Sequence, residues 1–595
     1  MSAIQYRPAL DGLRAVAVIA VILFHLDSGI LPGGFVGVDV FFVLSGFLIT
    51  SIICKEEDAG KFSFRKFYQR RLARIFPASL LVLVVVIFSA AYLYSPQDYA
   101  SVGAQAFSAA FSLANIKFML LGNYFEASPD SQPLLHFWSL SVEEQFYIVF
   151  PVIIALLSRT KALRSYLVPV LSILLLGSLL ACGLLTLYKP TWAFYLLPTR
   201  AWELLAGAIL AVVSKQGRDH SENLDFILGL TGLVVILGAF AFIHEGPMFP
   251  GFIAGVPVVG TLLILNSRRQ TAFTERALSN RLLVTIGKMS YSLYLWHWPV
   301  FCFVDYSYFD SPAYIRMPVK VALTVVLSCA CYYLFENPVR KFLNRPEKQL
   351  LGYLVVPALA IAIAVSGGWI RNHSYINATM HDVVCGGIQV NRGTSEKTVV
   401  LMGDSNGTMY GTILRDITAE LDASLIVAAV NGKDPLPGSE LFSQTLKILE
   451  NKKPRVTVFP ALWSGHCKSD PNRISVALDE LLDKTNHVIL LTQPPTLPQD
   501  ASRESFRRSG PHVIIEDTEV RNQREMINEV ICSLASDRVH VVDVSKKFEN
   551  AEGHIIFQDS QGRQLWHDRT HLSGFGTKLV NKELKLLIQS LLNSQ

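Results

Sequence analysis

Charged residues are scarce in this sequence. Asp, Glu, Lys and Arg make up 17% of its 595 residues, whereas a soluble protein usually carries about a quarter. Hydrophobic residues make up 51%. This balance argues against an ordinary soluble enzyme and is typical of a membrane protein. The net charge of +5 gives no reason to expect a nucleic-acid partner, because positive loops at one membrane face account for it.

Recognisable cysteine patterns are also missing. The eight cysteines show no CxxC spacing, so the sequence predicts no metal site. Five lie in or beside apolar segments and are expected to pack as small hydrophobic residues: Cys54, Cys182, Cys302, Cys329 and Cys331. The other three allow at most one internal disulfide, and the sequence does not choose the pair among Cys385, Cys467 and Cys532. No cleavable signal peptide is expected, because the first apolar run lacks a cationic leader and a small-residue cleavage site.

The hydrophobic residues are concentrated in the first 370 positions. About eleven runs approach the roughly 20 residues that cross a bilayer. They centre on residues 12–29, 35–53, 75–94, 138–157, 166–187, 200–213, 224–243, 250–266, 283–305, 318–335 and 351–369. The sixth run is short, and residues 100–121 could form a re-entrant or interfacial helix.

The positive charges between these runs predict an orientation. With the N-terminus in the cytoplasm, the loops on that side contain twenty Lys and Arg residues, at 54–74, 158–165, 214–219, 267–281 and 337–348. The opposite loops contain only Lys117, Lys189, Arg200 and Arg316. Cytoplasmic loops are enriched in Lys and Arg, so we expect everything after residue 370 to lie outside the cytoplasm.

The C-terminal third has a different pattern. Residues 371–395 are polar and predict a linker. Apolar strands then alternate with helical stretches such as Ile474–Leu482; the strands are expected at 398–402, 456–459, 487–491 and 539–543. This alternation predicts a parallel α/β sheet. The expected domains are a membrane domain at 1–348, a linking transmembrane helix and linker at 349–396, and an α/β domain at 397–595.

Two groups of residues indicate binding or catalytic roles. Arg14 and His25 are eleven residues apart in the first apolar helix, so they share a face and lie roughly 16 Å apart along it. Ionisable groups at membrane depth usually face a polar pathway, although Arg14 could instead reach the interface. In the α/β domain, Ser405 follows the first strand, and His571 could act as its base with Asp568 orienting the imidazole.

The C-terminal part resembles SGNH-type esterases and acyltransferases, which have a flavodoxin-like, three-layer fold. Gly403-Asp404-Ser405 matches their first sequence block, and Asp568-x-x-His571 matches their last. The resemblance implies an oxyanion hole formed by the backbone N–H groups of Ser405 and Gly432. The third block usually supplies an Asn, but Trp463 stands here; Asn431 or Asn406 could substitute, or only two donors exist.

The membrane part, over roughly residues 5–345, resembles the acyltransferase-3 family of bacterial O-acyltransferases. Five stretches carry the resemblance: Leu10–Arg14 with His25, Gly37–Phe47, Arg70–Pro77, His136–Tyr147 and Ser290–Pro299. It implies that cytoplasmic acetyl-CoA places its phosphates at Arg14, Arg70, Arg71 and Arg74, and that His25 assists acetyl transfer as a base or transient acceptor. Glu143, Glu144 or Asp39 could be the carboxylate partner of a histidine. We expect His297 to be a core or aromatic-belt residue.

The fused arrangement resembles O-antigen acetyltransferases of Gram-negative bacteria, and related fusions modify peptidoglycan. It implies a multi-pass inner-membrane enzyme with a periplasmic C-terminal domain. Its expected partners are acetyl-CoA, the lipid bilayer and a surface polysaccharide such as a lipid-linked O-antigen. Three alternatives remain open from the sequence: an acyl transporter that supplies the outer domain, an O-acyltransferase of peptidoglycan or exopolysaccharide, and a membrane-anchored glycan esterase.

Overall fold

The computed structural model describes most of the chain, in two compact units. It describes residues 6–27, 29–94, 96–121, 131–158, 160–214, 221–246, 248–267, 273–308, 311–374, 388–391, 393, 397–430, 432–468, 470–498 and 513–594. The chain divides between Ser374 and Tyr375 into a helical unit, Met1–Ser374, and an α/β unit, Tyr375–Gln595. Cys385 and Asn431, singled out above, lie outside the described residues.

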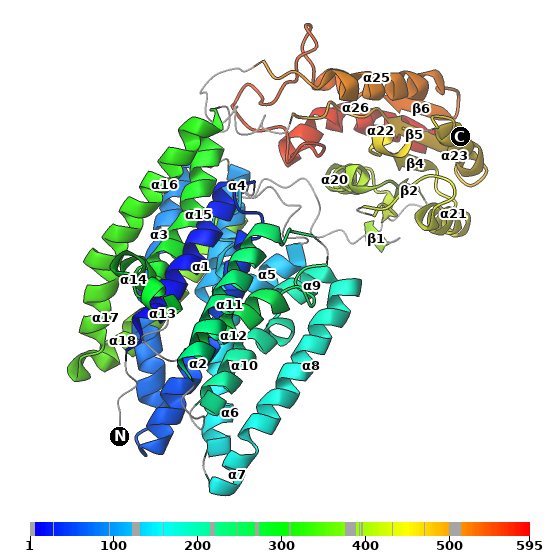
Figure 1. Cartoon of the computed structure of the whole chain (residues 1–595). Coiled ribbons are helices and arrows are strands. Elements are labelled where there is room, and N and C mark those ends of the chain that lie inside the picture. Colours follow the sequence, from blue (N-terminus) through cyan, green and yellow to red (C-terminus); the bar gives the residue numbers. More distant parts are fainter. Residues whose placement is uncertain are drawn as a thin grey trace. The chain divides into compact units, whose positions relative to one another are not determined.

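The helical unit consists of α1 to α18 (Figure 1). Their bounds are α1 Pro8–Leu26, α2 Gly37–Asp58, α3 Phe64–Leu93, α4 Pro96–Ala110, α5 Ala114–Leu121, α6 Phe137–Ser158, α7 Lys161–Ser165, α8 Leu167–Tyr188, α9 Pro190–Tyr195, α10 Leu197–Ser214, α11 Glu222–Phe242, α12 Gly255–Asn266, α13 Phe273–Leu278, α14 Arg281–Lys288, α15 Ser290–Ser307, α16 Ala313–Ala330, α17 Asn337–Leu343 and α18 Gln349–Ser374. A π-helical segment, Cys331–Glu336, joins α16 to α17.

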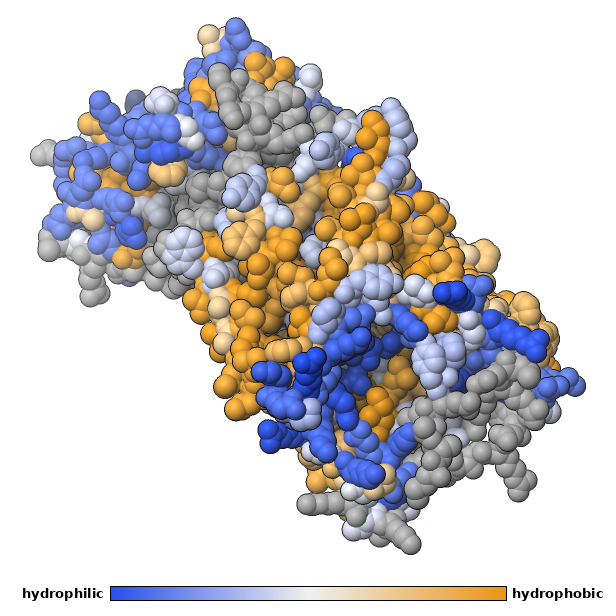
Figure 2. All heavy atoms as spheres, turned by 90° about the vertical axis from the view of Figure 1, so that its left-hand side faces the viewer, coloured by the Kyte–Doolittle hydropathy of each residue, from blue (hydrophilic) through white to orange (hydrophobic). Residues whose placement is uncertain are grey.

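Nine helical segments within the described residues are long and apolar enough to cross a membrane. They contain α1, α2, α3, α6, α8, α10, α11, α16 and α18, and α12 is a shorter apolar helix. Two of the eleven expected spans are thus absent from the nine: α12 is too short, and α15 includes Trp, Tyr and His side chains that lower its hydropathy. Hydrophobic residues cover much of the face of this unit in Figure 2, as lipid contact requires.

Close packing of α2 on α10 positions two buried charges. A Cβ atom on Gly46 would lie 1.8 Å from the carbonyl oxygen of Leu204, and one on Gly207 would lie 2.0 Å from that of Val43. Only glycine permits such backbone contact, as at small-residue crossings of membrane helices. The crossing brings Asp39 of α2 against Arg200 of α10. Arg200 therefore lies inside a helix pair, and its assignment to an outer loop was wrong.

The α/β unit contains a six-stranded sheet. The strands are β1 Ile388–Asn391, β2 Thr398–Leu401, β3 Ser424–Val427, β4 Val456–Phe459, β5 His487–Leu491 and β6 Val539–Val542. Their order is β1-β3-β2-β4-β5-β6; β1 is antiparallel to β3 and the other pairs are parallel. The five parallel strands follow the flavodoxin-like order, in which the strand order reverses between β2 and β4. β1 lies within the segment expected to be a linker.

Helices cover both faces of the sheet, giving three layers (Figure 1). Alternate strand residues such as Val399 and Leu401 pack with α20 (Gly411–Glu420) and α26 (Gly574–Asn593). The intervening residues, such as Val400, pack with α21 (Glu440–Lys452), α23 (Arg473–Leu482) and α25 (Thr518–Ser533). The strands read as continuous apolar runs because both faces are buried. The predicted three-layer α/β fold is confirmed.

Candidate functional sites in the two units

The helical unit encloses a cavity of about 180 Å³ that we call the arginine pocket. It is lined by Arg14, Arg71 and Arg74, by Lys288 and Arg340, and by Glu143 and Glu144. Arg14 lies in the second turn of α1, and the other two arginines lie in the first half of α3. Lys288 ends α14 and Arg340 lies in α17, so four helices bring cations to one cavity. Such a pocket is suited to phosphate oxygens, because guanidinium groups bind them in pairs.

Arg71 and Arg70 are adjacent in sequence but lie in different surroundings. The guanidinium of Arg71 lies 5.7 Å from the ring centres of Phe67 and Tyr147, at the wall of the arginine pocket. The side chain of Arg70 is 43% exposed and forms an ion pair of 2.8 Å with Glu56. Consecutive residues of a helix point about 100° apart, which explains the separation. The structure therefore brings Arg14, Arg71 and Arg74 together and leaves Arg70 outside.

Glu143 lies with the arginines rather than with a histidine. Its carboxylate accepts hydrogen bonds of 3.0 Å from Ser45 Oγ and from Tyr147 Oη. Glu144 lines the same pocket. The expectation that one of these carboxylates pairs with a histidine is not met, because α6 directs them toward α2 and α3.

His25 lines a second, smaller cavity, which we call the histidine cavity. This cavity measures about 20 Å³ and is lined by His25, Asp39, His136, Arg200 and Tyr294, among others. Tyr294 also lines the arginine pocket, so the two cavities adjoin at this residue. The ring of His25 lies 4.5 Å from that of Trp298 and 5.5 Å from that of His297. His297, expected to be a core residue, is fully buried and contacts His25.

A buried ion cluster closes one side of the histidine cavity. Arg200 forms ion pairs with Asp39 at 2.9 Å and with Glu203 at 3.1 Å, and all three side chains are at most 1% exposed. The rings of Phe42, Trp138, Phe194 and Phe249 surround the guanidinium at 5.5–5.7 Å. Asp39 is thus paired with Arg200 and not with a histidine. The sequence analysis missed Glu203 and the role of Arg200, although an Arg-x-x-Glu pair in an apolar helix was a signal.

In the α/β unit, Ser405 begins the short helix α19 (Ser405–Thr408) directly after β2. Gly403 has φ +143°, and a Cβ there would lie 2.2 Å from the carbonyl oxygen of Pro460, so the turn requires glycine. Asp404 is buried; its Oδ1 accepts hydrogen bonds from the N–H groups of Asn406 (2.8 Å) and Gly407 (3.3 Å). These bonds fix the turn that presents Ser405 at the point where the strand order reverses, a usual ligand site in such sheets.

His571 and Asp568 lie together on a tight turn before α26. The Nδ1 atom of His571 is 2.8 Å from Asp568 Oδ2, and Asp568 Oδ1 accepts the N–H groups of Thr570 and His571 at 2.9 Å. The N–H of Leu572 donates to the sulfur of Met409 at 3.3 Å, which ties this turn to the segment after Ser405. The Nε2 atom of His571 has no hydrogen-bond partner among the described residues and is the atom suited to take a proton.

The pKa values of this pair are shifted in opposite directions. Burial raises the pKa of Asp568, but hydrogen bonding to His571 and its charge outweigh burial and lower the pKa to about 2. Burial lowers the pKa of His571, while the hydrogen bond and charge of Asp568 and the charge of Asp404 raise it above the ordinary 6.5. The carboxylate is therefore ionised throughout the neutral range, and the imidazole becomes neutral as the pH rises through its raised pKa.

The oxyanion donors expected from the resemblance are only partly visible. Gly432 is exposed with φ +70°, and Asn431 lies outside the described residues. Trp463 is fully buried, and its Nε1 donates to the carbonyl oxygen of Leu491 at 2.8 Å, so it is a core residue. Asn406 is buried, and its amide has no hydrogen-bond partner among the described residues. Asn406 is thus the described side chain that could supply the third donor.

Sequence analysis missed His466, which also contacts the turn before Ser405. Its Nε2 lies 2.9 Å from Asp404 Oδ2, which additionally accepts the N–H of Leu462 at 3.0 Å. Arg473 donates to the carbonyl oxygen of His466 at 2.9 Å and pairs with Asp434 at 2.7 Å. These bonds link the segment after β4 to the segment after β2. No short motif signals His466, because its partners are far away in sequence.

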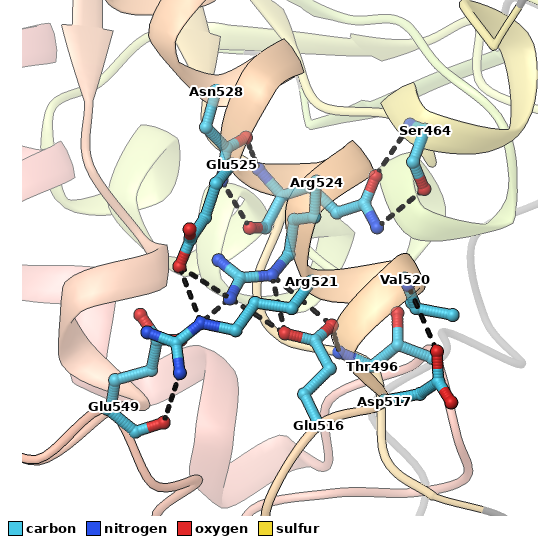
Figure 3. Close-up of polar contacts among 12 residues, drawn as sticks. Ser464, Thr496, Glu516, Asp517, Val520, Arg521, Arg524, Glu525, Asn528 and Glu549 are labelled. Atoms are coloured by element: carbon cyan, nitrogen blue, oxygen red, sulfur yellow. Dashed lines mark hydrogen bonds and ion pairs between the residues drawn. The ribbon is translucent and has the colours of Figure 1, made fainter.

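A polar network connects the segment after β4 to α25 (Figure 3). The side chain of Gln493 accepts the N–H of Ser464 at 2.8 Å and donates to Ser464 Oγ at 3.0 Å. The backbone of Gln493 is bonded in turn to the side-chain amide of Asn528 on α25. One turn earlier on α25, the buried Arg524 pairs with Glu516 at 2.7 Å and Glu549 at 2.6 Å. Through Gln493 and Asn528, the Ser464 segment is tied to α25.

Comparison with known families agrees with both units. Residues 7–336 match the family model described as an acyltransferase domain (acyltransferase-3, AT3). Residues 378–585 match the SGNH domain that is fused to AT3 domains. Since the first match covers more than half of the chain, the protein belongs to this acyltransferase family and is a multi-pass membrane protein.

Individual relatives are found in Staphylococcus aureus. The protein SAS0844 of strain MSSA476 is 34% identical over 352 residues, which cover 57% of this chain and 58% of that protein. The O-acetyltransferase OatA of strain NCTC 8325 is 32% identical over 387 residues, covering 60% of this chain and 63% of OatA. The chain thus spans less than two thirds of the length of these relatives.

Among the solved structures that match is the periplasmic domain of the lipopolysaccharide acetyltransferase of Salmonella ser. Paratyphi A. The identity is 13%, with 38% of this chain and 89% of that domain covered and a TM-score of 0.28.

Proposed function

We propose that this protein is an O-acetyltransferase that transfers acetyl groups from acetyl-CoA to a hydroxyl of a cell-surface polysaccharide. The arginine pocket is the observation that carries this proposal, because several partly buried cations gathered in a membrane unit call for an anionic ligand. Membership of the acyltransferase family supports acyl transfer, and the name of the relative OatA supports acetyl as the group. The hydrogen-bonded pair of His571 and Asp568 in the α/β unit supports a second acyl-transfer step, outside the membrane.

The arginine pocket would receive the donor. Arg14, Arg71 and Arg74 would bind phosphate oxygens, with Lys288 and Arg340 adding positive charge. The volume of about 180 Å³ is smaller than the roughly 300–1,000 Å³ of most small-molecule pockets. The slender acetyl-bearing arm therefore fits inside, while the bulkier nucleotide end would remain nearer the pocket mouth and the basic loops.

His25 would act at the far end of the donor. As a base, it would take the proton of the attacking hydroxyl while the new C–O bond forms and the C–S bond to CoA breaks, and it would then return the proton to the thiolate. As a transient acceptor, its ring nitrogen would carry the acetyl group. Tyr294, which lines both cavities, lies at the passage between donor and histidine.

The α/β unit would complete the transfer. Ser405 Oγ would attack the carbonyl carbon of the delivered acetyl group while His571 Nε2 takes its proton. The bond between the acetyl group and its carrier would break, and His571 would return the proton to the carrier. Asp568 would keep the imidazole in the required tautomer. A sugar hydroxyl would then attack the acetyl-serine, with its proton taken by His571 and returned to Ser405. Ser405, His571, Asp568 and the backbone N–H of Gly432 would form this site.

The basic loops support an orientation in a bacterial inner membrane. The twenty cations at 54–74, 158–165, 214–219, 267–281 and 337–348 would face cytoplasmic acetyl-CoA, and the α/β unit would face the opposite side. The acceptor would be a polysaccharide of the cell surface. We place lipopolysaccharide O-antigen first and peptidoglycan second.

The test measures ester-linked acetyl on lipopolysaccharide and, separately, on peptidoglycan, in cells that lack other acyltransferases of this type. We expect acetyl esters with the wild-type protein and none with His25→Ala or Ser405→Ala at equal membrane abundance. His244→Ala is the matched control, because this exposed histidine lies outside both cavities.

Three results would count against the proposal or part of it. Wild-type protein without acetyl esters on either polymer would refute the function. Full acetylation by His25→Ala would refute the donor step. Wild-type acetylation by Ser405→Ala would mean that the helical unit acetylates the glycan directly and that the α/β unit only binds it.

A further inference from the structure

His136 is a buried histidine that the mechanism above does not use. It lies one residue before α6, and its side chain is 3% exposed. Neither Nδ1 nor Nε2 makes a hydrogen bond of good geometry with the described residues, and the backbone of Leu295 is the polar group that interacts with the ring. A buried polar group without a partner costs about 1–3 kcal/mol, so such a group calls for a specific explanation.

The surroundings of His136 hold its ring in one place. Its backbone carbonyl accepts hydrogen bonds of 3.2 Å from both Ser139 Oγ and Tyr294 Oη, and those two hydroxyls are 2.6 Å apart. The rings of Phe137, Tyr294 and His297 lie 4.9, 5.6 and 5.7 Å from its ring. An imidazole packed on this many sides cannot turn away to find other partners.

The histidine cavity joins His136 to His25, since both line it. Its volume of about 20 Å³ has room for one water molecule, which needs about 10–15 Å³ on this measure. A buried water needs two to four polar partners, and the nitrogen atoms of two imidazoles supply them. One water between the rings would satisfy one of the two ring nitrogens of His136.

Asp39 and Arg200 also line this cavity, and Arg200 pairs with Asp39 and with Glu203. His297 uses Nδ1 toward the carbonyl oxygen of Tyr294 at 2.7 Å, and its Nε2 has no hydrogen-bond partner among the described residues. His25 and His136 are the histidines that line the cavity itself, so they are the imidazoles that a water in it would contact.

We propose that His136 and His25 form a proton relay through one water in the histidine cavity. When an acceptor hydroxyl attacks the acetyl carbon, the C–O bond forms and the C–S bond breaks. The hydroxyl proton passes to His136, through the water to His25, and from His25 to the CoA thiolate, so both imidazoles return to their starting state. This relay rests on the proposed function and makes His25 a proton carrier in it.

The test uses the purified full-length protein and compares wild type with His136→Asn, which removes the titrating ring and retains a polar side chain. Acetyl-CoA binding, the kcat of thiol release in the presence of acceptor, and the solvent isotope effect are measured. We expect unchanged acetyl-CoA binding and a kcat lowered by about 10²–10⁴-fold, the usual rate contribution of a proton-transfer group.

The second measurement is the solvent isotope effect. In mixtures of H₂O and D₂O, the kcat of the wild type should depend on the D₂O fraction along a curve, because several protons move in one step, and the kcat of the variant should depend on it linearly. His244→Asn, at an exposed histidine, is the control and should behave as wild type.

Two results would overturn the relay. One is a wild-type kcat in His136→Asn. The other is loss of acetyl-CoA binding together with activity, which would assign His136 a structural role. Failure of the proposed function would look different, because wild-type protein would then release no thiol from acetyl-CoA with any acceptor.

Discussion

At the scale of single residues, Arg71 and Arg70 provide a matched pair for testing the donor site. Arg71 lines the arginine pocket, whereas Arg70 is exposed and paired with Glu56. We expect Arg71→Ala to raise the KM for acetyl-CoA by about tenfold or more, because a charge-assisted bond to phosphate is lost. Arg70→Ala should leave the KM within about twofold. Steady-state kinetics of purified protein measure both, and equal effects would place the donor outside this pocket.

The pair of His571 and Asp568 predicts a defined pH dependence. His571 acts as a base only when neutral, and its pKa is raised above 6.5, so activity should fall with decreasing pH from above 6.5. Asp568→Asn removes the interactions that raise this pKa, so the acid limb should move to lower pH. The rate should also drop about 10³–10⁴-fold, as when triad geometry loses its orienting carboxylate.

This prediction is checked by pH profiles of acetyl-ester turnover by the full chain and the variant. The expected direction is fixed. The Asp568 carboxylate raises the pKa of His571 and moves the active pH range upward, so removing that carboxylate should move the range downward. An acid limb at the same pH in both proteins would show that Asp568 does not act on His571. Asp559→Asn, a carboxylate paired with Arg563 elsewhere in the unit, is the control.

At the scale of structural elements, α25 supports the site through buried charge. Arg524 is 1% exposed and pairs with Glu516, which is 2% exposed (Figure 3). Arg524→Met leaves Glu516 buried without a counter-ion, which should lower the free energy of unfolding of the α/β unit by about 3–5 kcal/mol. Arg521→Met, on the same helix, removes an exposed pair with Glu525 and should cost less than about 1 kcal/mol.

Hydrogen exchange of the amides in β5 and β6 of the full chain measures this difference. Exchange through unfolding of the sheet should be much faster in Arg524→Met and nearly unchanged in Arg521→Met. Equal protection in the two variants would mean that the Arg524 cluster adds no net stability. Because Asn528 of α25 is bonded to Gln493, which is bonded to Ser464, we also expect Arg524→Met to lower the activity of the Ser405 site.

At the scale of the whole molecule, the distribution of positive loops predicts the topology. Cys532 is an exposed, unpaired cysteine of the α/β unit and serves as a native probe. A membrane-impermeant thiol reagent should label Cys532 in cells whose outer membrane has been permeabilised, and Cys532→Ser should lose this label. Lys61→Cys and Arg345→Cys, in the loops expected to be cytoplasmic, should be labelled only after lysis. Labelling of Cys532 only after lysis would contradict the orientation and remove the need for transfer across the membrane.

The amino-acid sequence by itself determined the division into apolar and α/β parts, four of the six strands, and the positions of Ser405, Asp568 and His571. These features depend on local properties: runs of hydrophobic residues, alternation of strand and helix, and short motifs on one turn. The strands β1 and β3 were not predicted. β1 (Ile-Gln-Val-Asn) is half polar and lies in the segment expected to be a linker. β3 (Ser-Leu-Ile-Val) is as apolar and as long as the predicted strands and was overlooked. Arg14 and His25 were found for the same local reason, since they share one helix face.

Only the tertiary structure decided which side chains meet. The sequence could not show that Arg71 enters the pocket while Arg70 leaves it, that Glu143 lies with arginines, or that His136 shares a cavity with His25. Nor could it show that Asp39 pairs with Arg200, which depends on glycines that let α2 and α10 touch. The physical reason is that hydropathy determines whether a helix lies in the membrane, whereas its rotation and its neighbours depend on packing between residues far apart in the sequence.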